Sequence, residues 1–218
     1  MAYLSLSVLG IVTLGIWLLI NNVRKKWQKP SPLPILTDEE YEAWVKSWRD
    51  SLQQDGMKKL GLHDFNEIKV DRPLYLRSIV WPNSADADYY RSQGSPVLIK
   101  HGWNGRPHGS VNRFTFFYPT EHSIAVFTVD VKALDSMRFE RTRTYFYQDI
   151  VGVETSTFNI NDGQDCYVMQ QFDLRISSGQ SISATTHVHD LNVEETVQAL
   201  RTLLKEKKQG KPGGNYAL

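Results

Sequence analysis

The sequence predicts an α+β protein. It begins with an N-terminal transmembrane helix and a linker helix, followed by an antiparallel β-barrel or sandwich that a C-terminal α-helix closes. Three observations support this prediction. Residues 2–20 carry no charge, short runs of period two alternate with turn residues from about residue 74 to 186, and residues 192–208 form a capped amphipathic pattern.

Four regions follow from these patterns. We expect a transmembrane anchor over residues 1–23, a basic, proline-rich spacer with an amphipathic helix over 24–61, a β-rich domain over 62–209 and a disordered tail over 210–218.

The uncharged segment 2–20 is long enough to span a bilayer, because nineteen helical residues cover about 28 Å. Basic residues follow it at Arg24, Lys25 and Lys26, whereas a cleaved secretory signal would carry them in front. The positive-inside rule then places the N-terminus outside and the rest of the chain in the cytoplasm. Trp17 and Trp27 suit the headgroup region at the inner end of this helix. We therefore expect a single-pass protein of the bacterial inner membrane that contacts lipid through residues 2–20.

Composition limits the function of the remaining chain. With 25 basic and 24 acidic residues, the chain does not resemble a nucleic-acid-binding protein. Its one cysteine, Cys166, permits no intramolecular disulfide and fits a reducing compartment. We expect no cofactor.

A helix is predicted to start at Thr37, because Thr37 and Glu40 have the capping-box spacing. Gly56 or Gly61 should end it. Its apolar stripe consists of Tyr41, Trp44, Val45, Trp48 and Leu52. The stripe can dock on the following domain or lie on the bilayer surface, and the mixed charge of the polar face favours docking.

The β-rich region divides into seven predicted strands: Leu74–Trp81, Pro96–His101, Val111–Tyr118, Ser123–Val131, Tyr145–Val153, Cys166–Ser177 and Gln180–Thr186. One face of the fourth strand carries Ala125, Phe127, Val129 and Val131, and one face of the sixth carries Cys166, Val168, Phe172, Leu174 and Ile176. The final helix should bury Val193, Val197, Leu200 and Leu204.

Three stretches carry a resemblance to a known family: Tyr145–Glu154 (YFYQDIVGVE), Phe172–Gln180 (FDLRISSGQ) and Val197–Lys207 (VQALRTLLKEK). Together they resemble bacterial pleckstrin-homology-like (PH-like) domains over about residues 110–208. The resemblance implies a PH-like fold and a binding role, and it brings no catalytic residues. Residues 62–110 depart from a minimal PH domain, so they belong either to the barrel or to a separate subdomain.

Two groups of residues are candidates for a ligand or partner site. The glycine-containing loop 100–113 carries Lys100, His101, Arg106, His108 and Arg113, which could bind an anionic group, although such residues are also ordinary in loops. Arg138, Arg141 and Arg143 could join Lys100 and Arg106 in a basic rim at one end of the barrel. Trp103 and Trp81 could anchor a partner if they are exposed.

His187 and His189 would lie on one face of an extended segment, a spacing that can hold a metal. A third ligand is not evident, and His101, His108, His122 or Cys166 would have to supply it. A metal-dependent enzyme is therefore the weaker alternative. We expect instead a membrane-anchored binding module that holds a protein partner or supports assembly, with binding of anionic lipid headgroups by the basic rim as the other possibility.

Overall fold

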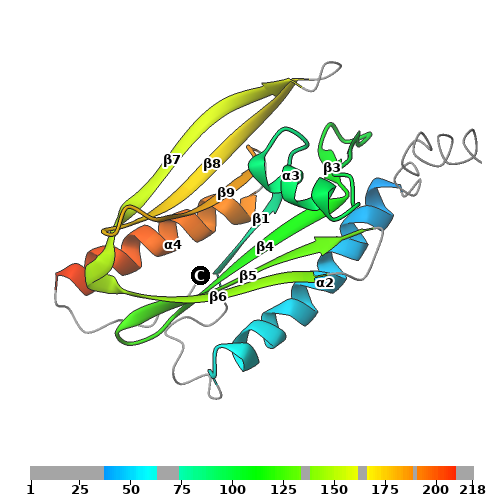
Figure 1. The fold of residues 1–218 in the computed structure, drawn as a ribbon. Coiled ribbons are helices and arrows are strands. Elements are labelled where there is room, and N and C mark those ends of the chain that lie inside the picture. The colour runs from blue at the N-terminus through cyan, green and yellow to red at the C-terminus, as the bar shows by residue number, and fades with distance from the viewer. Residues whose placement is uncertain (1–36, 63–73, 134–137, 162–165, 189–190, 210–218) are drawn as a thin grey trace, which may run out of the picture. The chain divides into compact units, whose positions relative to one another are not determined.

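The structure is a computed structural model that describes residues 37–62, 74–133, 138–161, 166–188 and 191–209 (Figure 1). The predicted anchor over residues 2–20, its interface residues Trp17, Arg24, Lys25, Lys26 and Trp27, and the predicted tail lie outside these ranges. Of the helices that are described, none combines the length and the apolar character needed to cross a bilayer.

Helix α2 (Asp38–Lys59) begins at the predicted capping box. The Thr37 hydroxyl accepts a hydrogen bond from the Glu40 N–H, and the Glu40 carboxylate accepts one from the Thr37 N–H at 2.8 Å. The helix continues through Gly56 and ends before Gly61, whose φ is +72°. A Cβ at position 56 would lie 2.6 Å from Cδ1 of the Phe127 ring and 2.6 Å from the Tyr118 hydroxyl, so only glycine allows the helix this close to the sheet.

A four-stranded antiparallel sheet lies beneath α2, with the strand order β1-β4-β5-β6. Its strands are β1 (Leu74–Ile79), β4 (Val111–Pro119), β5 (Ser123–Lys132) and β6 (Arg138–Phe146). Val45 and Leu52 of the helix pack against Phe116 and Phe127 of the sheet. The prediction that the apolar stripe docks on the domain is therefore confirmed.

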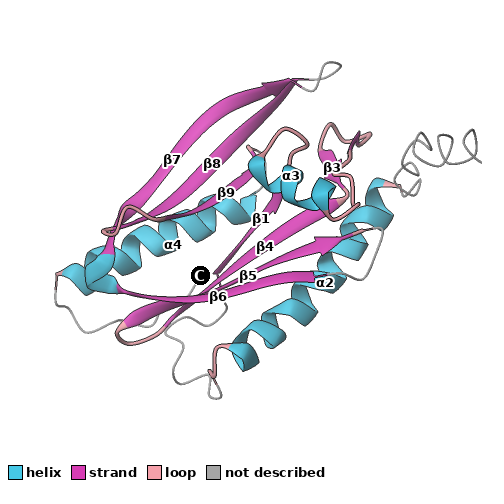
Figure 2. Cartoon of the chain, viewed as in Figure 1, coloured by secondary structure: helices cyan, strands magenta, loops and turns pink. Residues whose placement is uncertain are grey.

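The other face of this sheet packs against a second sheet and helix α4 (Leu191–Lys208). The second sheet contains β7 (Ile150–Asn161), β8 (Cys166–Ile176) and β9 (Ser181–His187). Phe117 and Ile124 meet Phe172 and Leu200 in this core. Figure 2 shows α2 and α4 on opposite sides of the four-stranded sheet. Because both faces are covered, β4 and β5 are buried along nearly their whole length.

The strands do not close into a barrel, which corrects that part of the prediction. Strands β1 and β9 lie near each other but belong to separate hydrogen-bonded sheets. The Thr196 hydroxyl of α4 instead donates a hydrogen bond to the backbone carbonyl of Tyr75 in β1, at 3.0 Å. The hydroxyl of α4 thus donates a hydrogen bond to β1, which is an edge strand of its sheet. In a closed barrel, β1 would instead pair with another strand.

Residues 74–79 belong to the main sheet, and an insertion separates them from β4. The insertion contains α3 (Ala85–Ser92) and the short hairpin of β2 (Ile99–His101) and β3 (Pro107–Gly109). Ala87 and Tyr90 of α3 pack against Val97 and Val111. The sequence pattern did not predict this helix, which Ser84 caps by accepting from the Ala87 N–H.

Strand β6 corrects the prediction of a single strand over Tyr145–Val153. A 3₁₀ turn, η2 (Tyr147–Asp149), separates β6 from β7, so Arg138, Arg141 and Arg143 lie within a strand and not before one. Residues 141–144 are all exposed. A strand that is open on both faces shows no apolar alternation, which is why the pattern missed it.

The predicted buried face of β8 is right for one half of the strand only. Phe172, Leu174 and Ile176 are buried, but Cys166 and Val168 are exposed. In this outer half the opposite face is buried instead, where Tyr167 and Met169 pack against Trp81. The β7–β8 hairpin extends past the main core, so its outer half packs its other face on the insertion.

Candidate binding groove beside strand β6

A polar groove with a volume of about 210 Å³ opens between the four-stranded sheet and the start of β9. Cross-strand register builds its floor. Thr115 of β4, Thr128 of β5 and Arg141 of β6 lie in one row, and Val126 and Arg143 lie in the next. The other lining residues are Asp86, Arg113, Ser181, Ile182 and Ser183. The groove is therefore lined mainly by guanidinium and hydroxyl groups, which donate hydrogen bonds to anions.

Arg113 is held by carboxylates on two sides. Its Nε and Nη2 atoms donate to Asp130 at 2.7 Å each, and Nη1 donates to Asp86 at 2.7 Å. Burial alone would lower the pKa of Arg113, but its hydrogen bonds and ion pairs with Asp130 and Asp86 outweigh burial and raise the pKa. Tyr90 also donates its hydroxyl to the buried Asp130. This network makes Arg113 a structural residue and not a free cation.

Among the described residues, the positive charges of Arg141 and Arg143 are not paired with carboxylates in this way. None of the ion pairs formed within the described ranges includes either side chain. Arg143 donates to the Tyr145 hydroxyl at 3.2 Å, and the Arg141 guanidinium lies 4.7 Å from the centre of the Phe139 ring. Both remain able to bind a carboxylate or a phosphoryl group.

Arg138, the third arginine of β6, lies on the opposite side of the strand. It pairs with Asp55 of α2 at 3.3 Å and stacks its guanidinium 4.5 Å from the centre of the Trp48 ring. Of the three arginines on β6, only Arg141 and Arg143 therefore line the groove.

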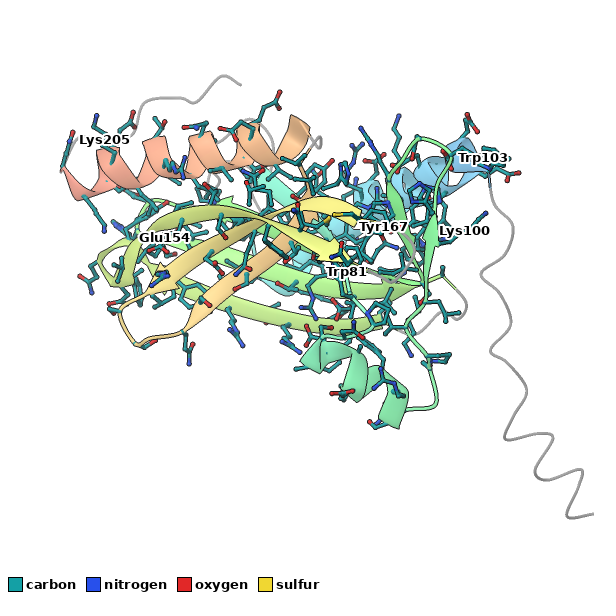
Figure 3. The ribbon with its side chains drawn as sticks, turned by 90° about the horizontal axis from the view of Figure 1, so that it is seen from above. Trp81, Lys100, Trp103, Glu154, Tyr167 and Lys205 are labelled. Atoms are coloured by element: carbon teal, nitrogen blue, oxygen red, sulfur yellow. The ribbon has the colours of Figure 1, made fainter. Side chains whose placement is uncertain are left out.

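Of the predicted site residues in loop 100–113, Arg113 lines the groove with Arg141 and Arg143, and the others do not. Lys100, His101, Trp103 and Arg106 lie on the β2–β3 hairpin, where Figure 3 labels Trp103 and Lys100. Trp103 is 95% exposed. His101 Nδ1 lies 3.0 Å from the Tyr167 hydroxyl, which joins the hairpin to β8.

His108 is buried, although the sequence suggested a ligand-binding cation. Its ring stacks on Tyr41 with a centroid distance of 4.0 Å, and its Nε2 lies 3.6 Å from the Asp38 carboxylate without a hydrogen bond. Burial lowers the pKa of His108, although the negative charges of Asp38 and Glu42 oppose this. A ligand at the surface cannot reach this ring.

A second, smaller pocket of about 40 Å³ lies where β1, β9 and the hairpin meet. Arg77, Arg106 and His187 line it, together with the buried Thr186, whose hydroxyl has no hydrogen-bond partner. Arg77 donates to Glu42 at 3.0 Å, so its charge is balanced. A pocket of this size and polarity has room for water.

The predicted metal pair is only partly visible, because His189 lies outside the described residues. Within the described ranges, no three histidine, cysteine, aspartate or glutamate side chains gather around one point. His122 is exposed beside Glu121, and His101 and His108 take part in the aromatic contacts given above. Among the residues that the structure describes, no set of ligands therefore forms around His187.

An apolar groove of about 630 Å³ separates the β7–β8 hairpin from the insertion. Trp81, Ile99, Phe158 and Ile160 line it. Trp81 is only 9% exposed and packs on Tyr167 at a centroid distance of 5.6 Å. Figure 3 labels both residues. The sequence singled out Trp81 but not Phe158 or Ile160, because the predicted strand ended at Val153, whereas β7 continues to Asn161.

Comparisons with protein-family models, with curated proteins and with solved structures found no match to this chain.

Proposed function

We propose that this chain is a single-pass membrane-anchored binding protein whose cytoplasmic, PH-like domain holds an extended acidic segment of a protein partner. The uncharged stretch 2–20 and the basic residues after it support the anchor and its direction. Four antiparallel strands, three further antiparallel strands and a closing C-terminal helix support the PH-like assignment.

Strand β6 is the observation that carries the proposal. No strand in the described part of the chain pairs with its outer edge, and residues 141–144 are exposed in succession. An edge strand can accept an added strand through backbone hydrogen bonds. Arg141 and Arg143 are two residues apart and face the groove together, so they would lie opposite side chains two residues apart in the added strand. Acidic residues at alternate positions of the partner satisfy this geometry.

A lipid headgroup is the second candidate, because the same guanidinium and hydroxyl groups can bind phosphate. The exposed edge favours a peptide, since a headgroup leaves the backbone donors and acceptors of β6 unused. Thr142 and Thr144, on the face of β6 away from the groove, are also exposed and could contact a polypeptide.

Site-specific photo-crosslinking of the full chain in its native membrane tests this proposal. A photoreactive residue at Thr142 should capture one protein, and the same residue at Ser92 of α3, which is also exposed, should not. The double change Arg141→Glu and Arg143→Glu should abolish the crosslink, because it places like charges opposite the acidic segment.

Lys46→Glu with Lys205→Glu is the matched control. Both lysines are exposed, Lys46 on α2 and Lys205 on α4, and replacing them changes the net charge by the same amount as the two arginine substitutions do. A crosslink that persists in the arginine variant and the control alike would disprove the role of the groove. Capture of lipid and not protein at position 142 would favour the headgroup alternative.

A further inference from the structure

Trp103 is the most exposed of the large hydrophobic side chains that the structure describes. It is 95% exposed, whereas the others with marked exposure, such as Val151 at 61% and Phe146 at 55%, are partly covered. The other tryptophans in the described ranges, Trp44, Trp48 and Trp81, all take part in packing. None of the hydrophobic clusters formed by the described residues includes the Trp103 ring.

The hairpin tip that carries Trp103 is held in place by its backbone. The Asp38 carboxylate accepts hydrogen bonds from the N–H groups of Trp103 at 3.2 Å and Asn104 at 2.7 Å. The Gly102 N–H donates to the Arg106 carbonyl at 2.9 Å and closes the turn. Because the tip is ordered before any partner arrives, contact through Trp103 costs little backbone entropy.

Asp38 also joins the tip to the N-terminal end of α2. It is the first residue of α2, so Trp103 lies at the point where the chain enters the domain. If Trp27 lies at the headgroups, as predicted, residues 28–37 form the connection. Ten residues reach at most about 33–36 Å, and the hairpin tip is hydrogen-bonded to Asp38, the residue that follows them.

From these observations we propose that Trp103 inserts into the headgroup region of the bilayer that the anchor spans, as a second attachment that orients the domain. Tryptophan rings favour this region of a membrane. A single weak contact becomes effective when a first attachment keeps the local concentration high. This inference rests on the proposed anchoring and is independent of the β6 groove.

The charges around the tip indicate an apolar contact. The hairpin carries two basic residues, Lys100 and Arg106, and the first turn of α2, whose Asp38 accepts hydrogen bonds from the hairpin tip, carries the acidic Asp38, Glu39 and Glu40. Attraction to anionic lipid therefore adds little, and insertion should be the same in zwitterionic and anionic bilayers and insensitive to salt.

Fluorine NMR of the full chain in lipid nanodiscs, with all tryptophans replaced by 5-fluorotryptophan, tests this inference. The resonances are assigned with Trp17→Phe, Trp81→Phe and Trp103→Phe. Spin-labelled lipid should broaden the Trp103 resonance and leave the buried Trp81 resonance sharp. A paramagnetic agent dissolved in water should broaden the Trp103 resonance less than it broadens that of free 5-fluorotryptophan.

The Trp17 resonance separates the two ways in which the inference can fail. If lipid broadens Trp17 but not Trp103, the anchor is present and the proposed insertion is wrong. If lipid broadens neither, the proposed anchoring fails and the insertion fails with it. If neither reagent broadens Trp103 while Trp17 responds to lipid, a protein surface covers the ring and membrane insertion is overturned.

Discussion

Replacing Arg113 with methionine should destabilise the domain far more than the same replacement of Arg141 or Arg143. Arg113 makes three hydrogen bonds of 2.7 Å to Asp130 and Asp86, and Asp130 is only 2% exposed. Without the guanidinium, the Asp130 carboxylate stays buried with the Tyr90 hydroxyl as its remaining partner among the hydrogen bonds described above. Arg141 and Arg143 leave no buried charge behind when they are truncated.

Breaking a buried ion pair by removing one partner costs about 3–5 kcal/mol. A chain of this size loses roughly 2–4 °C of its unfolding midpoint per kcal/mol, so Arg113→Met should lower the midpoint by about 6–20 °C. Exposed substitutions usually change stability by less than about 0.5 kcal/mol. Arg141→Met and Arg143→Met should therefore shift the midpoint by about 2 °C or less.

Thermal unfolding of the detergent-solubilised chain, followed by near-ultraviolet circular dichroism, measures these midpoints. The double variant Arg113→Met with Asp130→Leu should be more stable than the sum of its single changes, because it removes both charges together. Equal midpoints for Arg113→Met and Arg141→Met, or additive effects in the double variant, would refute the distinction between a structural arginine, Arg113, and two arginines that form no ion pair among the described residues, Arg141 and Arg143.

Three further predictions concern the packing of α2. Burial lowers the pKa of His108, so the folded state binds its proton less readily than the unfolded state does. The contribution of His108 to the free energy of unfolding should therefore be fully present above about pH 6.5 and be lost as the pH falls below it. Denaturant titrations at several pH values should show a smaller loss for His108→Phe. Leu52→Ala removes three buried carbon groups, so it should lower the free energy of unfolding by about 2.4 kcal/mol from lost transfer, and by up to about 5 kcal/mol when the cavity is included. Urea unfolding measures this loss, and Lys46→Ala, at an exposed position of the same helix, should leave the stability unchanged. Tyr41→Phe should cost about 1–3 kcal/mol in the same assay, because the buried Gly109 N–H loses its acceptor at 2.9 Å.

These three results can each contradict the structure. A His108→Phe variant with an unchanged pH profile would mean that the folded and unfolded states bind the proton of His108 equally. A Leu52→Ala variant as stable as Lys46→Ala would mean that α2 is not docked on the sheet. A Tyr41→Phe variant without any loss would mean that another acceptor reaches the Gly109 N–H.

Features set by neighbouring residues could be predicted from the sequence. The capping box at Thr37 needs only Glu40, and the apolar stripe of α2 needs only helical spacing, so both were found. The edge strand β6 was missed because its exposed positions leave no apolar period, although the two-residue spacing of Arg141 and Arg143 was a usable sign of a shared strand face.

Features that depend on distant partners could not be predicted in this way. Arg113 was a candidate ligand residue until Asp130 and Asp86 were seen to bind it, and nothing nearby in the chain identifies those partners. His108 likewise looked like a surface cation, and only its contact with Tyr41 of α2 shows that it is a buried ring. Charge alone in a loop therefore does not distinguish a ligand site from a structural ion pair.

The arginines of β6 also have a competing explanation that must be separated from binding. Charged side chains on an exposed edge strand prevent unwanted pairing between copies of a protein, and Arg141 and Arg143 could serve only this purpose. Such a guarding role depends on the presence of charge and not on its sign, so glutamate at both positions should leave the oligomeric state unchanged. A binding role depends on the sign, so the same change should abolish capture of an acidic partner. Size-exclusion chromatography and crosslinking of this one variant therefore distinguish the two roles. A lost crosslink with an unchanged oligomeric state is expected only if β6 binds a partner.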